Sequence, residues 1–124
     1  MSYFKNKVVW ITGASSGIGE ALAYAFAEHE ARLIISARRV DELERVKKNC
    51  SLADGDIMVL PMDVADHTSM EKHAAEVIGN FGRIDILVNN AGIAGPTAAI
   101  EDTVLQEWQQ TLDVNLTGAF LCTR

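Results

Sequence analysis

A glycine-rich segment placed directly after an apolar run is the feature that most constrains the fold of this chain. Residues 12–19 read Thr-Gly-Ala-Ser-Ser-Gly-Ile-Gly, and the preceding residues 8–11 read Val-Val-Trp-Ile. This order predicts a buried strand that enters a tight turn and then a helix over residues 17–29. Backbone N–H groups at such a turn, together with the helix N-terminus, bind a pyrophosphate. The residues predicted to form this binding turn are Gly13, Ser15, Ser16, Gly17, Ile18 and Gly19.

The three glycines of the turn have different predicted roles. Gly13 allows the tight turn, Gly17 lets the phosphates approach the backbone, and Gly19 lets the helix pack closely on the strand.

Apolar runs alternate with amphipathic segments along the rest of the chain. Strands are predicted at residues 7–11, 32–36, 57–60 and 84–88, and helices at residues 17–29, 40–52 and 66–78. A last helical region, capped by Asp102 or Thr103, runs through Leu112. Alternation of this kind predicts right-handed crossovers and a Rossmann-type, doubly wound parallel sheet in the order 3-2-1-4. We expect one α/β domain over residues 1–124, with Asp66 as the N-cap of the third helix and Gly79 or Gly82 near its end.

Composition excludes several classes of protein. With 48% hydrophobic residues the chain can build a core, and a net charge of −6 without a basic stripe argues against nucleic-acid binding. No run approaches the roughly 18 apolar residues of a membrane span. Cys50 and Cys122 lack C-x-x-C spacing and are interpreted as reduced thiols of a cytoplasmic protein, although two cysteines alone leave a disulfide open. The three histidines match no metal-ligand spacing, so no metal site is predicted.

The last ten residues, 115–124, keep an apolar helical pattern and stop without a C-cap glycine or proline. The fourth strand would also remain an unpaired, apolar sheet edge. Both features predict a truncated chain.

Four motifs in order resemble the short-chain dehydrogenase/reductase family. They are Thr-Gly-x-x-x-Gly-x-Gly at residues 12–19, Asp63-Val64, Asn89-Asn90-Ala91-Gly92, and Asn115 within Val-Asn-Leu-Thr-Gly. The resemblance covers residues 7–124 and corresponds to the first half of a member of about 250 residues. Its early part is similar to members that reduce carbonyls on lipids, steroids or retinoids, and its later part to 3-oxoacyl reductases and sugar dehydrogenases. The substrate therefore stays open.

The end of the second strand predicts the cofactor. About 20 residues beyond the glycines, an Asp or Glu accepts the ribose hydroxyls of NAD, but this chain has Ala37 there, followed by Arg38 and Arg39. A guanidinium suits the 2′-phosphate of NADP(H), through charge-assisted hydrogen bonds. We predict this role for Arg38 first and Arg39 second; the alternative is a solvated start of the next helix.

Other predicted site residues follow the third and fourth strands. Asp63 lies at the edge where open α/β sheets bind ligands, and the resemblance implies that it meets the adenine amino group while Val64 packs on the ring. The resemblance also implies that Asn90 fixes the central sheet and that Ala91 and Gly92 flank the cofactor. A structural role and a cofactor contact are both open for Asn89. Asp85, buried by its pattern, is predicted to support the backbone.

The resemblance implies that Asn115 is catalytic and holds a water in a proton relay. The family's catalytic Ser and Tyr-x-x-x-Lys are missing: no Ser follows Ser69, and Tyr3 with Lys7 precedes the first strand at the wrong end of the sheet. The leading hypothesis is the cofactor-binding half of an NADP-dependent oxidoreductase that interconverts a carbonyl and a hydroxyl on a small molecule, inactive as this chain alone. A non-enzymatic NADP-binding sensor or scaffold is the alternative. The resemblance implies a homodimer or homotetramer at full length.

Overall fold

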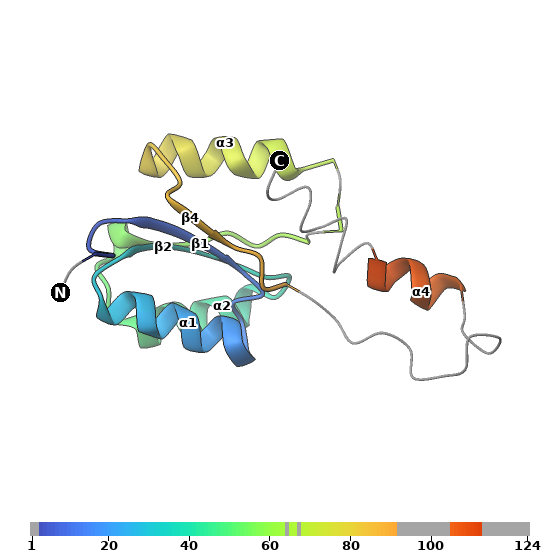
Figure 1. Cartoon of the computed structure of the whole chain (residues 1–124), viewed down its shortest axis with the longest axis horizontal. Coiled ribbons are helices and arrows are strands. Elements are labelled where there is room, and N and C mark those ends of the chain that lie inside the picture. Colours follow the sequence, from blue (N-terminus) through green and yellow to red (C-terminus); the bar gives the residue numbers. More distant parts are fainter. Residues whose placement is uncertain (1–2, 64, 67, 92–104, 113–124) are drawn as a thin grey trace.

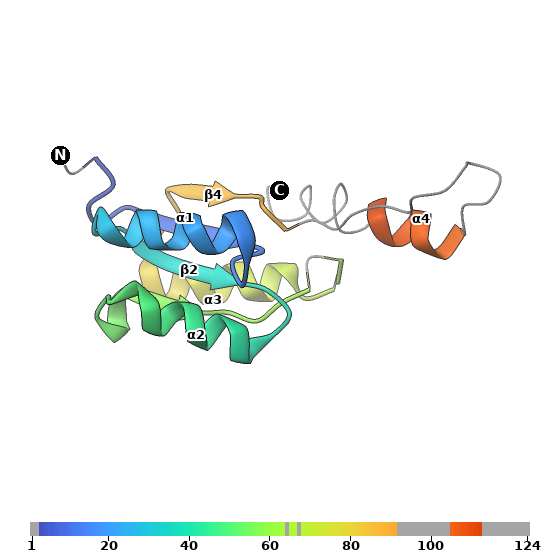
Figure 2. The same cartoon turned by 90° about the horizontal axis from the view of Figure 1, so that it is seen from below.

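The computed structural model describes residues 3–63, 65–66, 68–91 and 105–112. The elements in chain order are β1 (Val8–Thr12), α1 (Gly17–Glu28), β2 (Arg32–Ser36), α2 (Val40–Cys50), a 3-10 turn η1 (Asp54–Asp56), β3 (Ile57–Val59), α3 (Met70–Phe81), β4 (Ile86–Val88) and α4 (Leu105–Leu112). The strands are parallel in the order β3-β2-β1-β4, which confirms the predicted topology. Helices α1 and α2 cover one face of the sheet and α3 covers the other, as Figures 1 and 2 show.

Alternate residues of the central strands face opposite layers, which is why continuous apolar runs form these strands. Val9 and Ile11 of β1 pack with buried residues of α1 and α2, whereas Val8 and Trp10 pack on the α3 side with Val77. All five residues of β1 are buried. The strand that enters the glycine turn is therefore held from both sides.

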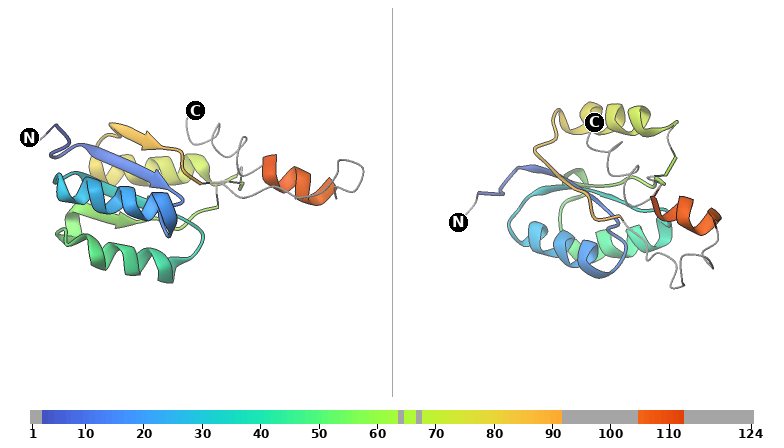
Figure 3. Two further views of the ribbon diagram at one scale, coloured as in Figure 1. Left: turned by 60° about the horizontal axis from the view of Figure 1, so that its bottom comes forward. Right: turned by 45° about the vertical axis from the view of Figure 1, so that its right-hand side comes forward.

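The strand register brings the carboxyl ends of all four strands to one edge of the sheet (Figure 3). Thr12 lies opposite Ser36, and Ile11 lies opposite Val88. Beyond β3, the N–H of Met62 donates to the carbonyl of Ala37 over 2.9 Å, so the pairing of these two chain segments continues past the strands. The predicted site residues that follow each strand are thus neighbours.

Helix α3 begins later than predicted, at Met70, and Asp66 is not its N-cap. One oxygen of Asp66 accepts hydrogen bonds from the N–H and the hydroxyl of Thr68, and the other accepts from Ser69 Oγ over 3.0 Å. These bonds form a local turn that competes with helix formation. At the other end the helix continues past the predicted Ile78 to Phe81, and of the two glycines expected near its end it is Gly82 that forms the C-cap, with a φ of 82°.

The prediction that Asp85 is buried is wrong, because Asp85 lies at the exposed edge of the sheet rather than in the core. Its Oδ2 accepts a hydrogen bond of 2.8 Å from the N–H of Val8 and another from Arg83 Nε. The predicted support of the backbone is therefore confirmed. These contacts lower the pKa of Asp85, mainly through the bond from Val8 and then through Arg83.

Within the described ranges, no helix is long and apolar enough to cross a membrane, and no cluster of metal-ligand side chains is present. Cys50 is a free, buried thiol at the end of α2. Burial raises its pKa to about 11, with a smaller contribution from the charge of Glu20. Cys122 lies outside the described residues.

Candidate functional site

The glycine turn between β1 and α1 has a backbone conformation that suits a bound anion. Gly13 and Gly17 have φ angles of 65° and 56°, values that side chains with a Cβ rarely adopt. Nothing lies within 4 Å of the position that a Cβ would take at Gly17, so the backbone there is open to a ligand. Ser16, at the N-cap of α1, makes no side-chain capping bond. The first N–H groups of the helix therefore remain available as donors to an anion.

Gly19 is buried where α1 meets the ends of β1 and β4. A Cβ there would lie 2.6 Å from Asn90 Nδ2 and would also overlap the carbonyl of Gly13. This geometry confirms the predicted role of Gly19 in close helix–strand packing. The same Asn90 amide donates to the carbonyl of Gly13 over 3.1 Å, so it ties the turn to the loop after β4.

Thr12 is a buried contact point that the sequence analysis did not identify. Its Oγ1 accepts hydrogen bonds of 3.1 Å from the N–H groups of Asn90 and Ala91, and it donates to the carbonyl of Val88. Its exposed fraction is 1%. The partners are more than 70 residues away in the chain, so no local spacing could have indicated them. Thr12 and Asn90 together fix the site edge between β1 and β4.

Arg38 and Arg39 lie just beyond the end of β2 and are both exposed. Arg39 pairs loosely with Asp41, at 3.6 Å between Nη2 and Oδ2. Arg38 makes no ion pair or hydrogen bond with any residue that the structure describes. Of the two guanidinium groups, that of Arg38 is thus the one left free toward a ligand by its described surroundings.

Asp63 is exposed beyond β3, next to the end of β2. Its Oδ1 accepts a hydrogen bond of 2.9 Å from the N–H of Ala65, which leaves Oδ2 without a described partner. The turn, the end of β2 and Asp63 thus follow one another along the edge of the sheet. Of the other predicted site residues, Val64, Gly92 and Asn115 lie outside the described residues.

The Tyr3 and Lys7 pair lies at the amino end of β1, away from the glycine turn. Lys7 Nζ is 5.5 Å from the centre of the Tyr3 ring, which is a cation–π contact. The prediction that this pair has no part in the site is in agreement with its position.

Arg45 of α2 is a second residue that the sequence analysis missed. It donates to both oxygens of Glu20 in α1, over 2.9 and 3.1 Å, and to the carbonyl of Ser15 in the turn, over 3.1 Å. Tyr24 donates to Glu20 over 2.6 Å. The hydrogen bonds from Arg45 and then from Tyr24 lower the pKa of Glu20 to about 2, and the bond to Glu20 raises the pKa of Tyr24.

Comparison with known proteins agrees with this geometry. The family model for short chain dehydrogenase matches residues 7–124. The chain belongs to the short-chain dehydrogenase/reductase family. Human dehydrogenase/reductase SDR family member 7 is 46% identical over 123 residues, which cover 96% of this chain and 36% of that protein.

Two solved structures of the family carry dinucleotides. A metagenomic short-chain oxidoreductase in complex with NADP has a TM-score of 0.91 and 31% identity, with 98% of this chain and 55% of that chain covered. The 3-ketoacyl-(acyl-carrier-protein) reductase of Brucella melitensis, complexed with NADH, has a TM-score of 0.89 and 33% identity, with 98% and 49% covered. This chain therefore spans between about one third and just over one half of the length of these relatives.

The described residues fit a dinucleotide of the kind that this family binds. The open backbone at Gly17 and the uncapped start of α1 suit the diphosphate. The free Arg38 and the free oxygen of Asp63 lie along the same edge of the sheet, where open α/β sheets bind ligands. The chain is thus a family member with an NAD(P)-binding fold.

Proposed function

We propose that this chain binds NADP(H) in preference to NAD(H) and forms the cofactor-binding part of an oxidoreductase that interconverts a carbonyl and a hydroxyl. The observation that carries the proposal is the exposed guanidinium of Arg38 at the end of β2. It has no described partner, and Ala37 stands where a carboxylate would accept the ribose hydroxyls of NAD. An acidic side chain there would instead repel a 2′-phosphate.

The size of the preference follows from the bonds that Arg38 can form. Hydrogen bonds to a charged group contribute about 1.5–3 kcal/mol, which corresponds to a preference of roughly ten- to a hundredfold. Arg39 contributes less in this proposal, because Asp41 already offsets part of its charge. In the same proposal the free oxygen of Asp63 accepts from the adenine amino group, and Val64, Ala91 and Gly92 line the nucleoside.

The nicotinamide supplies the hydride, and the protein supplies its position and the proton path. We assign the diphosphate to the turn over residues 13–19, and a part in the proton path to Asn115. The substrate is a small-molecule carbonyl or alcohol.

Binding of both dinucleotides to the protein and to an Arg38→Ala variant tests the proposal. Titration calorimetry should give a dissociation constant for NADPH roughly ten- to a hundredfold higher in the variant, with the value for NADH nearly unchanged. Arg83→Ala is a matched control, because it removes an exposed guanidinium at the opposite end of the sheet. Equal losses for both dinucleotides in Arg38→Ala would show that Arg38 does not contact the 2′-phosphate.

Turnover is tested separately, in the longer oxidoreductase of which this chain would form the cofactor-binding part. Asn115→Ala should abolish turnover of a carbonyl substrate while NADPH still binds. Unchanged turnover would remove Asn115 from the mechanism.

A further inference from the structure

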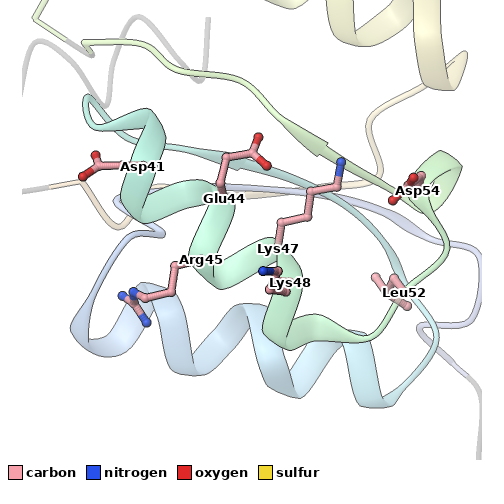
Figure 4. Close-up of a pocket in the computed structure, with 7 residues that line it drawn as sticks. All are labelled: Asp41, Glu44, Arg45, Lys47, Lys48, Leu52 and Asp54. Atoms are coloured by element: carbon pink, nitrogen blue, oxygen red, sulfur yellow. The ribbon is translucent and has the colours of Figure 1, made fainter.

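A side chain of the next helix, α2, contacts the glycine turn between β1 and α1. Arg45 reaches from α2 across to α1, donates from its two terminal nitrogens to the two carboxylate oxygens of Glu20, and also donates to the carbonyl of Ser15. In Figure 4 its side chain extends toward α1, whereas Glu44 and Lys47 extend on the other side of α2. The two partners are 25 and 30 residues away, so the contact joins separate segments around the turn.

The bond to Ser15 determines how the turn presents its donors. In a trans peptide the C=O and the following N–H point in opposite directions. Arg45 holds the Ser15 carbonyl toward α2, so the N–H of Ser16 is directed away from it, and no described residue accepts a hydrogen bond from that N–H. Arg45 thus keeps one donor of the turn free and oriented.

The bonds from Arg45 to Glu20 offset a negative charge that would disfavour an anion at the turn. Glu20 lies in the first turn of α1, close to the helix end that would receive a diphosphate. A carboxylate near an anion site repels the anion, and the side chain of Glu20 is only 21% exposed, so solvent screens it incompletely. Glu20 stays ionised because its pKa is about 2. Arg45 supplies a compensating positive charge at 2.9 Å, which it shares with Glu42 of α2 at 3.1 Å.

Arg45 also borders a shallow hollow on the outer side of α2, but this hollow does not by itself explain the position of the Arg45 side chain. The residues that line this hollow are Asp41, Glu44, Arg45, Lys47, Lys48, Leu52 and Asp54. Three are acidic and three are basic, so the hollow has no preference for an anion. Arg45 donates one hydrogen bond within α2, over 3.1 Å to Glu42, and its other three lead away from the hollow, to the turn and to α1.

We propose that Arg45 is a positioning residue for the cofactor diphosphate, which it serves by orienting the Ser15–Ser16 peptide and neutralising Glu20. This inference rests on the proposed dinucleotide binding. It differs from the role of Arg38 in one measurable respect. The diphosphate is common to both dinucleotides, so loss of Arg45 should weaken NADPH and NADH equally.

The test compares Arg45→Met with Lys48→Met, which removes a positive charge from the same helix without a contact to the turn. Arg45→Met should raise the dissociation constants of NADPH and NADH together by about three- to tenfold, and Lys48→Met should leave both unchanged. Hydrogen exchange of the free protein should be faster at residues 13–17 in Arg45→Met, with other segments unaffected. The double variant Glu20→Gln/Arg45→Met should regain part of the affinity, because the repelling carboxylate of Glu20 is removed as well. It should keep the faster exchange, because the hydrogen bond to Ser15 is still missing.

Two results would overturn the inference while the protein itself still binds dinucleotide. One is an unchanged affinity in Arg45→Met, and the other is a general fall in protection across α1 and α2, which would make Arg45 a structural residue only. If the unmutated protein binds neither dinucleotide, the proposed function fails, and the inference fails with it. Binding measurements on the unmutated protein alone distinguish that outcome from a failure of the inference about Arg45.

Discussion

Gly19→Ala tests the packing of the turn against the ends of β1 and β4. The new methyl group would lie 2.6 Å from Asn90 Nδ2 and overlap the carbonyl of Gly13, which is backbone and cannot rotate away. Overpacking of this kind costs about 1–3 kcal/mol, and a weakened bond between Asn90 and Gly13 adds about 1 kcal/mol. Alanine returns about 1 kcal/mol through its better helix propensity. The expected net loss in the free energy of unfolding is about 2 kcal/mol.

Thermal unfolding measured by circular dichroism should show this loss as a decrease in Tm of about 6–12 °C for a chain of this size. Gly79→Ala is the matched control, because Gly79 is also helical and nothing lies within 4 Å of the Cβ position there. That variant should be more stable by about 0.5–1 kcal/mol. If both variants raise the Tm, the close approach at Gly19 does not exist in solution and the reasoning is refuted.

Three further predictions concern polar contacts around the same edge. Thr12→Val should lower the free energy of unfolding by about 1–3 kcal/mol in urea denaturation, since buried backbone groups lose their partner, and Thr12→Ser should retain most of the stability. Ser36→Ala should cost a similar amount, about 1–3 kcal/mol, because it leaves the buried Trp10 Nε1, now bonded at 2.8 Å, without an acceptor; a Tm equal to that of the unmutated protein would contradict this. The lowered pKa of Glu20 means that its ionised form stabilises the fold above about pH 4.5 and that this contribution is lost as the pH falls toward 2. Glu20→Gln should therefore flatten the pH dependence of Tm between about 4.5 and 2, and an unchanged pH profile would exclude the ion pair with Arg45.

The layout of the fold could be predicted because its signals are local and repeated. Apolar runs separated by helices of ten or more residues indicate parallel strands, and the handedness of crossovers then selects the order 3-2-1-4. The structure confirms that order. The glycine turn was likewise predictable, since positive φ at Gly13 and Gly17 is a demand that only a few residue types meet.

Two details were wrong for separate physical reasons. Asp66 forms bonds with Thr68 and Ser69 that delay the start of α3, and such bonds compete with a helix in a way that apolar periodicity does not register. Asp85 follows the alternation of a buried strand but lies at an edge where solvent reaches it. Sequence pattern alone does not distinguish the two positions.

The contacts of Thr12 and Arg45 could not have been predicted, because their partners are brought together only by the fold. Thr12 bonds to residues that follow β4, and Arg45 bonds across from α2 to the turn. Neither partner stands at a helical or strand spacing from the residue. Residues whose contacts with the turn depend on the fold, such as Arg45, can therefore be identified only from the structure.

The position of β1 between β2 and β4 has a consequence for synthesis on the ribosome. Its first neighbour, β2, follows within 25 residues, but Val88 of β4 is made 76 residues after Thr12. At translation rates of about 5–20 residues per second, the emerging chain waits about 4–15 s for the second neighbour. During that interval one edge of a strand that is fully buried in the folded protein has no native partner, which leaves the nascent chain open to association with other chains.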